Sequence, residues 1–142
     1  MSDQLAKRSS WGHGEPSTAL DRVTHGVIGA AIEVHRVLGP GLLESIYEDA
    51  LCVELKLAGL SFERQLPVKV HYKGLPIGEA RIDLLVCGNL IVELKTVEKF
   101  APVHTAQVLS YLKIMNLRLG LLVNFNVAQL RQGLKRVIRS PT

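Results

Sequence analysis

The 142-residue chain lacks the features of a membrane protein, a disulfide scaffold or a zinc protein. It has no apolar run near the ~20 residues that span a bilayer, and its polar start, residues 1–10, lacks a signal peptide's apolar centre. Cys52 and Cys87 are isolated in apolar segments, which predicts buried free thiols rather than a disulfide or metal ligands. No His/Cys set has zinc spacing and no glycine loop is built for phosphates. We therefore expect a cytoplasmic protein without membrane contacts.

Acidic residues are missing from one end of the chain. Residues 99–142 contain seven Lys and Arg and no Asp or Glu, whereas residues 1–98 contain ten basic and 13 acidic residues. This asymmetry suits a polyanionic partner, although a merely solvated basic surface has the same composition. The hydrophobic content of 47% and charged content of 21% are typical of a globular protein with a real core.

The spacing of apolar residues predicts alternating helices and strands. We expect a tail over residues 1–16 and one domain over residues 17–142, which begins with a helix capped by Ser17 or Thr18. Gly59 should end the second helix, and Pro67 should mark a bulge or bend in the first strand. The predicted helices cover residues 18–37, 43–58, 102–115 and 128–138, and the predicted strands cover residues 61–72, 77–86, 90–95 and 120–124. The order ααβββαβα favours an α/β fold with a mixed sheet flanked by helices.

The segment 81–95 is the most informative part of the chain. Its apolar runs flank Cys87-Gly88-Asn89, which predicts a β-hairpin. A three-residue turn there would place Asp83 opposite Glu93, with Lys95 on the same face because side chains alternate along a strand. Two carboxylates and an ammonium on a hydrophobic sheet are costly unless something binds them. A divalent cation fits, because hard cations take carboxylate oxygens, whereas a cross-strand ion-pair cluster is the structural alternative.

The same residues, together with two further motifs, resemble the PD-(D/E)XK nuclease superfamily. Asp83, nine further residues and Glu93-Leu94-Lys95 match its D…ExK pattern, with Ile82 where the family name has a proline. Gly41-Leu42-Leu43-Glu44-Ser45-Ile46-Tyr47 is a literal GxxExxY and resembles the family named after that motif. Gln107-Val108-Leu109-Ser110-Tyr111 is similar to the QxxxY motif of the superfamily's recombination-exonuclease branch. The resemblance covers about residues 20–139.

The resemblance implies a restriction-endonuclease-like fold and metal-dependent hydrolysis of phosphodiester bonds. It assigns Asp83, Glu93 and Glu44 as ligands of Mg²⁺ or Mn²⁺, with the Leu94 carbonyl as a further ligand. Lys95 would orient the attacking water or stabilise the transition state. For Glu44 alone, a carboxylate favoured by the helix dipole is the simpler interpretation, and for Tyr47 we favour packing with a polar tip.

Three polar residues of the predicted helix 102–115 share one stripe. His104, Gln107 and Tyr111 fall at i, i+3 and i+7, and could contact phosphate or support the metal ligands. The buried side of that helix should carry Val108, Leu109 and Leu112. An exposed polar face is the alternative for the stripe.

Nucleic acid is the expected partner, with DNA favoured over RNA, and a homodimer stays open. The predicted last helix, with Arg131, Lys135 and Arg136, would engage backbone phosphates. Two other functions remain open beside the nuclease. One is a nucleic-acid-binding module with little or no turnover, and the other is an interaction subunit whose acidic residues serve structure.

Overall fold

The computed structural model describes residues 17–140, so the expected tail over residues 1–16 lies outside the described residues. The elements follow the expected order as far as the fourth strand. They are α2 (Thr18–Leu38), α3 (Glu44–Leu57), β1 (Phe62–Tyr72), β2 (Leu75–Val86), β3 (Leu90–Lys95), α4 (Pro102–Met115), β4 (Leu119–Asn124), the 3-10 helix η1 (Leu130–Gly133) and β5 (Leu134–Ile138). Within residues 17–140, no helix has the length and apolar character needed to cross a membrane.

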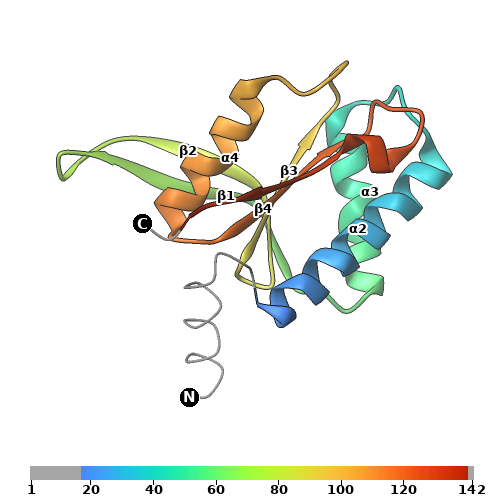
Figure 1. Cartoon of the computed structure of the whole chain (residues 1–142), viewed down its shortest axis with the longest axis horizontal. Helices are drawn as coiled ribbons and strands as arrows, with labels where there is room; N and C mark the ends of the chain where they lie inside the picture. The colour runs from blue at the N-terminus through green and yellow to red at the C-terminus, as the bar shows by residue number, and fades with distance from the viewer. Residues whose placement is uncertain (1–16, 141–142) are drawn as a thin grey trace.

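The strands form one five-stranded mixed sheet in the order β1-β2-β3-β4-β5. Only the β3–β4 pair is parallel, because α4 carries the chain back across one face before β4 begins. Helices α2 and α3 cover one face of the sheet, and α4 covers the other (Figure 1). The predicted α/β fold with a mixed sheet flanked by helices is therefore confirmed.

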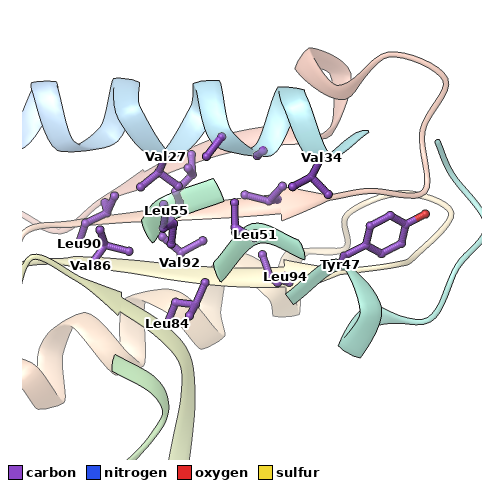
Figure 2. Close-up of a cluster of buried hydrophobic side chains, with 14 of the residues drawn as sticks. Val27, Val34, Tyr47, Leu51, Leu55, Leu84, Val86, Leu90, Val92 and Leu94 are labelled. Atoms are coloured by element: carbon purple, nitrogen blue, oxygen red, sulfur yellow. The ribbon is translucent and has the colours of Figure 1, made fainter. Parts of the chain in front are cut away.

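The larger core lies between the sheet and the helices α2 and α3. Figure 2 shows side chains of β2 and β3, including Leu84, Val92 and Leu94, packed towards Val27 of α2 and Leu51 of α3. All five are fully buried. A second, smaller core lies on the opposite face and packs against α4. Burying a large aliphatic side chain contributes about 1.5–3 kcal/mol, so the two cores fix the strands that carry the expected site.

The predicted helix over residues 128–138 is wrong. The chain forms the short η1 and then β5, which pairs antiparallel with β4 from Leu119↔Ile138 to Val123↔Leu134. Gly133 comes so close to β4 that an added Cβ would lie 2.2 Å from the carbonyl oxygen of Asn124. Apolar spacing alone could not reveal that β4 needed a partner on its open edge.

This correction separates the basic residues expected on one helix. Arg136 lies 3.3 Å from Asp21 of α2, whereas Lys135 lines a groove with residues of α4, on the other side of the sheet. A basic helix that engages phosphates is therefore absent from residues 128–138.

Several local predictions are confirmed and two are wrong. Ser17 caps α2 by accepting the Leu20 N–H at 3.1 Å, and Gly59 follows α3 with φ +75°. The irregularity in the β1–β2 pairing lies at Val70/His71 rather than at Pro67. Leu109 is 36% exposed and does not belong to the buried side of α4.

Candidate active site where β2 and β3 separate

The turn between β2 and β3 sets which residues face each other. Cys87 and Gly88 have φ of +51° and +73°, as the two central residues of a type I′ turn require. The pairs run from Val86↔Leu90 to Leu84↔Val92 and end there. The same register continued by one residue places Asp83 opposite Glu93, so the predicted register is confirmed.

Beyond that last pair β2 and β3 separate. Two carboxylates there take the place of the backbone hydrogen bonds between the strands. We call this place, formed by residues 83 and 93–95, the fork. A Glu93 carboxylate oxygen accepts the Asp83 N–H at 2.7 Å, and an Asp83 carboxylate oxygen accepts the Leu94 N–H at 2.8 Å. Each side chain therefore satisfies a backbone donor of the opposite strand that would otherwise lack a partner. The second oxygen of each carboxylate makes no such backbone bond.

Both carboxylates of the fork are held in an unfavourable environment. Burial, and then repulsion from Asp83, raises the pKa of Glu93 to about 8, against the lowering effect of its hydrogen bond to the Asp83 N–H. Burial also raises the pKa of Asp83, although the Leu94 N–H lowers it. Lys95 lowers both pKa values, but less than burial raises them. The fork is therefore short of positive charge, which is the condition that a bound cation relieves.

Lys95 is positioned from the opposite helix. Its ammonium donates to Oε1 of Gln107 on α4 at 3.0 Å. Tyr111, one turn further along α4, also interacts with Gln107, and burial and the neighbouring Glu93 raise the pKa of its hydroxyl. The structure thus brings two members of the expected α4 stripe to the fork.

His104, the third member of that stripe, has a structural contact. Its Nδ1 accepts the Ala101 N–H at 2.9 Å, and its ring packs edge-on against Phe100 at 6.0 Å between centroids. These contacts close the first turn of α4 and satisfy one of the donors that a helix start leaves free. A contact of His104 with substrate stays a prediction.

Glu44 comes to the fork from the first turn of α3. The residue is half-buried, and its pKa is raised by burial, then by Asp83, against the lowering effect of Lys95. The Glu44 carboxylate also raises the pKa of Glu93. Its charge is therefore part of the fork rather than only a favourable charge at a helix end.

The remaining residues of Gly41–Tyr47 explain how Glu44 is held. Tyr47 is buried and stacks on Phe125, with 4.4 Å between ring centroids. Its hydroxyl donates to the Gly39 carbonyl and accepts the Leu42 N–H. The tyrosine is thus a core residue with a polar tip, as we expected, and it fixes the loop that precedes Glu44.

Sequence reasoning gave no role to Glu48 and Gln65, which complete the acidic side of the fork. The Gln65 amide donates to Glu48 at 2.8 Å and to Asp83 at 3.4 Å, and Glu48 is buried. Arg64 offsets the charge of Glu48 with a contact of 3.0 Å. The spacing of Glu44 and Glu48, one helical turn apart, could have indicated a second acidic residue there. No local sequence pattern indicated a role for Gln65. Its backbone conformation, with a φ of +48°, depends on the strand pairing around it.

The donor set fits a hard divalent cation. Mg²⁺ is usually bound through one or two carboxylates and keeps several waters, and Asp83 and Glu93 provide two carboxylates in contact with each other's strands. As the side chains are arranged within residues 17–140, no three His, Cys, Asp or Glu are close enough to surround one ion. Metal binding by Asp83, Glu93, Glu44 and the Leu94 carbonyl stays a prediction.

Comparison with known proteins gives one match. The family model that matches residues 21–137 is described as the PD-(D/E)XK nuclease superfamily. The matched range includes every residue of the fork as well as Glu44, Gln107 and Tyr111. No curated protein and no solved structure matches the chain.

Proposed function

Because the chain belongs to the PD-(D/E)XK nuclease superfamily, we propose that it is a metal-dependent nuclease that hydrolyses phosphodiester bonds at the fork. The observation that carries the proposal is the convergence of Asp83, Glu93 and Glu44 around Lys95, in a site where burial raises the pKa of all three carboxyls. The literal GxxExxY over residues 41–47 supports the further proposal that the chain belongs to the branch named after that motif.

Asp83 and Glu93 are the proposed ligands of Mg²⁺ or Mn²⁺, supported by Glu44 and the Leu94 carbonyl. When bound by these residues, the metal would supply positive charge that offsets the charge on the phosphate oxygens in the transition state. The backbone bonds of Asp83 and Glu93 hold one oxygen of each carboxylate in place. The metal would bind the second oxygens, of which that of Asp83 also accepts the Gln65 amide at 3.4 Å. Little reorganisation is then needed when the metal and substrate arrive, which favours catalysis.

Lys95 is the proposed group beside the reacting water. Its three N–H donors include one that is held by Gln107, which leaves the others to orient water or to contact a phosphate oxygen. Gln107 and Tyr111 position this ammonium and close the fork on the α4 side. In this mechanism the carboxylates hold the metal and the lysine acts on the attacking group.

A nucleic-acid-binding module without turnover is the second candidate function. The observation that favours it is that Asp83 and Glu93 already accept backbone N–H groups, so they also serve to close the gap between two strands. In that case metal would bind weakly at the fork, and nucleic acid would bind without being cut.

Replacement of Lys95 by alanine separates the two functions. Cleavage of labelled DNA and RNA in Mg²⁺ or Mn²⁺ should fall by about 10²–10⁴-fold, because the lost group acts on the reacting water and the developing charge. Mn²⁺ binding should persist, because an ammonium is not a metal ligand. Lys113→Ala, which removes an exposed lysine of α4, is the matched control and should cut at the unmutated rate.

The outcomes are distinct. Equal cleavage by Lys95→Ala and Lys113→Ala would remove Lys95 from the mechanism. If the unmutated protein binds nucleic acid but cuts none of the substrates with either metal, the binding module replaces the nuclease.

A further inference from the structure

Strands β1 and β2 continue beyond the sheet as a two-stranded arm. The last pair that packs against the smaller core is Val68↔Ala80. Between these two residues, every residue from Lys69 to Glu79 except Val70 is exposed. Figure 1 shows the pair of strands extending past α4 at the left of the view. We call residues 69–79 the arm.

The arm is regular although little of the domain supports it. Its strands pair from Lys69↔Glu79 to Tyr72↔Leu75, with one bulge at Val70/His71. Lys73 and Gly74 have φ of +50° and +81°, which again fits a type I′ turn. The arm is therefore a defined ribbon rather than an irregular loop.

Its tip exposes apolar side chains that a free surface does not favour. Tyr72, Leu75 and Ile77 are 60%, 67% and 64% exposed. A cluster of this kind on a projecting ribbon indicates a contact with another molecule.

The charge on the arm indicates what that molecule is. The arm contains Lys69, His71 and Lys73 against one acidic residue, Glu79, which lies opposite Lys69 at the base of the arm. The Lys73 ammonium lies 5.5 Å from the centre of the Tyr72 ring, so the aromatic ring and the cation form one surface at the tip. Basic side chains beside an aromatic and apolar tip fit a nucleic acid, whose backbone is anionic and whose base edges accept both polar and apolar contacts.

The arm is joined to the fork by residues 80–82 of β2 and leads away from it. Strand β2 runs from Leu75 at the tip to Asp83 at the fork, eight residues or about 27 Å in extended conformation. The tip can therefore contact DNA about 27 Å from a phosphate held at the fork, a distance that spans several base pairs at a rise of about 3.4 Å each.

From this geometry we propose that the arm lies in the major groove of double-stranded DNA, to one side of the phosphate bound at the fork. The major groove of B-form DNA admits a two-stranded β-ribbon, whereas the major groove of an RNA duplex is too deep and narrow for side chains to read. Lys69 and Lys73 contact the phosphates that border the groove, and the tip contacts base edges. The inference rests on the proposed function only in placing the substrate phosphate at the fork.

Binding of a labelled 30-base-pair DNA duplex by the full chain tests the arm. Fluorescence anisotropy without divalent ions makes this measurement independent of cleavage. Leu75→Ser/Ile77→Ser should weaken duplex binding at least fivefold, and Lys69→Ala/Lys73→Ala should weaken it and reduce the slope of log affinity against log salt by about two. Val53→Ser/Leu57→Ser, at exposed apolar positions of α3, is the matched control and should bind as the unmutated protein does.

Competition with other nucleic acids tests the groove. The unmutated protein should prefer the DNA duplex to a single strand and to an RNA duplex of the same sequence. Equal affinity for the three would overturn the groove assignment. Thermal unfolding should be unchanged in all arm variants, which excludes misfolding as the cause of weaker binding.

Three outcomes distinguish the arm from the nuclease and from a dimer. If DNA is cut but the arm variants bind duplex normally, the arm proposal is wrong and the nuclease stands. If the arm variants lose binding but the unmutated protein cuts nothing, the nuclease proposal is wrong and the arm stands. If the arm variants abolish a dimer in sedimentation analysis and leave duplex affinity unchanged, the arm joins two copies and its contact with DNA is refuted.

Discussion

The fork and the arm share strand β2, which pairs with β3 towards the fork and with β1 in the arm, and they depart from the usual distribution of residues in opposite ways. At the fork, Asp83 and Glu93 are carboxylates in a largely buried place. On the arm, Leu75 and Ile77 are aliphatic residues in a largely exposed place. A buried charge is costly without a partner, and an exposed apolar cluster is unusual without one.

The difference between them concerns how strongly the domain holds each part. The fork is enclosed by α3, α4 and two packed cores. The stability of the whole domain therefore offsets the cost of burying the fork carboxylates. The arm has few contacts outside its own two strands, so its residues contribute little to stability and are free to be selected for binding. Substitutions at the two places should therefore change different measurements.

The largest effect should come from removing a fork carboxylate. Glu93→Gln should lower cleavage by about 10³-fold or more, because metal charge stabilisation is worth several kcal/mol in the transition state. Steady-state cleavage with Mg²⁺ measures this loss. Glu63→Gln, an exposed carboxylate on β1, should cut at the unmutated rate. A cleavage rate of Glu93→Gln within tenfold of the rate of the unmutated protein would contradict metal binding at the fork.

A pair of aliphatic truncations compares the two parts of β2 directly. Leu84→Ala, next to the fork and fully buried, should lower the free energy of unfolding by about 2–5 kcal/mol. Ile77→Ala, on the arm, should change it by no more than about 0.5 kcal/mol. Urea unfolding of both variants measures these values. Similar losses at the two positions would show that the arm packs against the domain after all.

The pH dependence of stability should come from the fork. Between about pH 4.5 and 8 the folded protein retains a proton on Glu93 that the unfolded chain releases, because the pKa of Glu93 is raised to about 8. The stability contribution of this group is therefore greatest below its unfolded pKa and falls as the pH rises to about 8. The fall is on the order of a few kcal/mol, and the raised pKa of Asp83 acts in the same direction.

Urea unfolding of the metal-free protein across this pH range checks the direction. Glu93→Gln should flatten the dependence and should be more stable than the unmutated protein at pH 8. Glu79→Gln on the arm should leave the curve unchanged. Stability that rises between pH 5 and 8, and falls in Glu93→Gln, would mean that Glu93 is well paired in the folded protein.

The smallest of these effects should come from the group that positions Lys95. Gln107→Ala removes the acceptor of the Lys95 ammonium and should lower kcat about threefold to tenfold with little change in KM, because Lys95 itself remains. Gln107→Glu should partly restore the rate, since a carboxylate also accepts this hydrogen bond. A change in KM alone would instead make Gln107 a contact to substrate.

Local patterns were sufficient to predict most of the elements and the pairing at the fork. The Cys87-Gly88-Asn89 turn sets the register of the hairpin, and a register of period two decides which residues are opposite each other. The helix starting after Ser17 and the helix from Pro102 carry their boundary residues in the sequence itself. The position of Glu44 beside the fork was implied by family resemblance, because nothing local relates α3 to β3.

The last segment shows where local patterns fail. Residues 134–138 have apolar spacing that allows a helix, but the edge of β4 offers backbone hydrogen bonds along its whole length, and β5 takes them. The same dependence on neighbours applies to Gln65, whose link between Glu48 and Asp83 exists only because β1, β2 and α3 meet there.

The sequence by itself determined the hairpin register, the positions of the helices α2, α3 and α4, and the superfamily, because turns, caps and motif residues act over a few positions. Only the tertiary structure decided that the final basic residues lie on a strand, that β2 separates from β3 at Asp83, and that the fork is dry enough to raise the pKa of Glu93. These properties depend on which distant elements pack together, since desolvation and strand pairing are set by neighbours in space rather than along the chain.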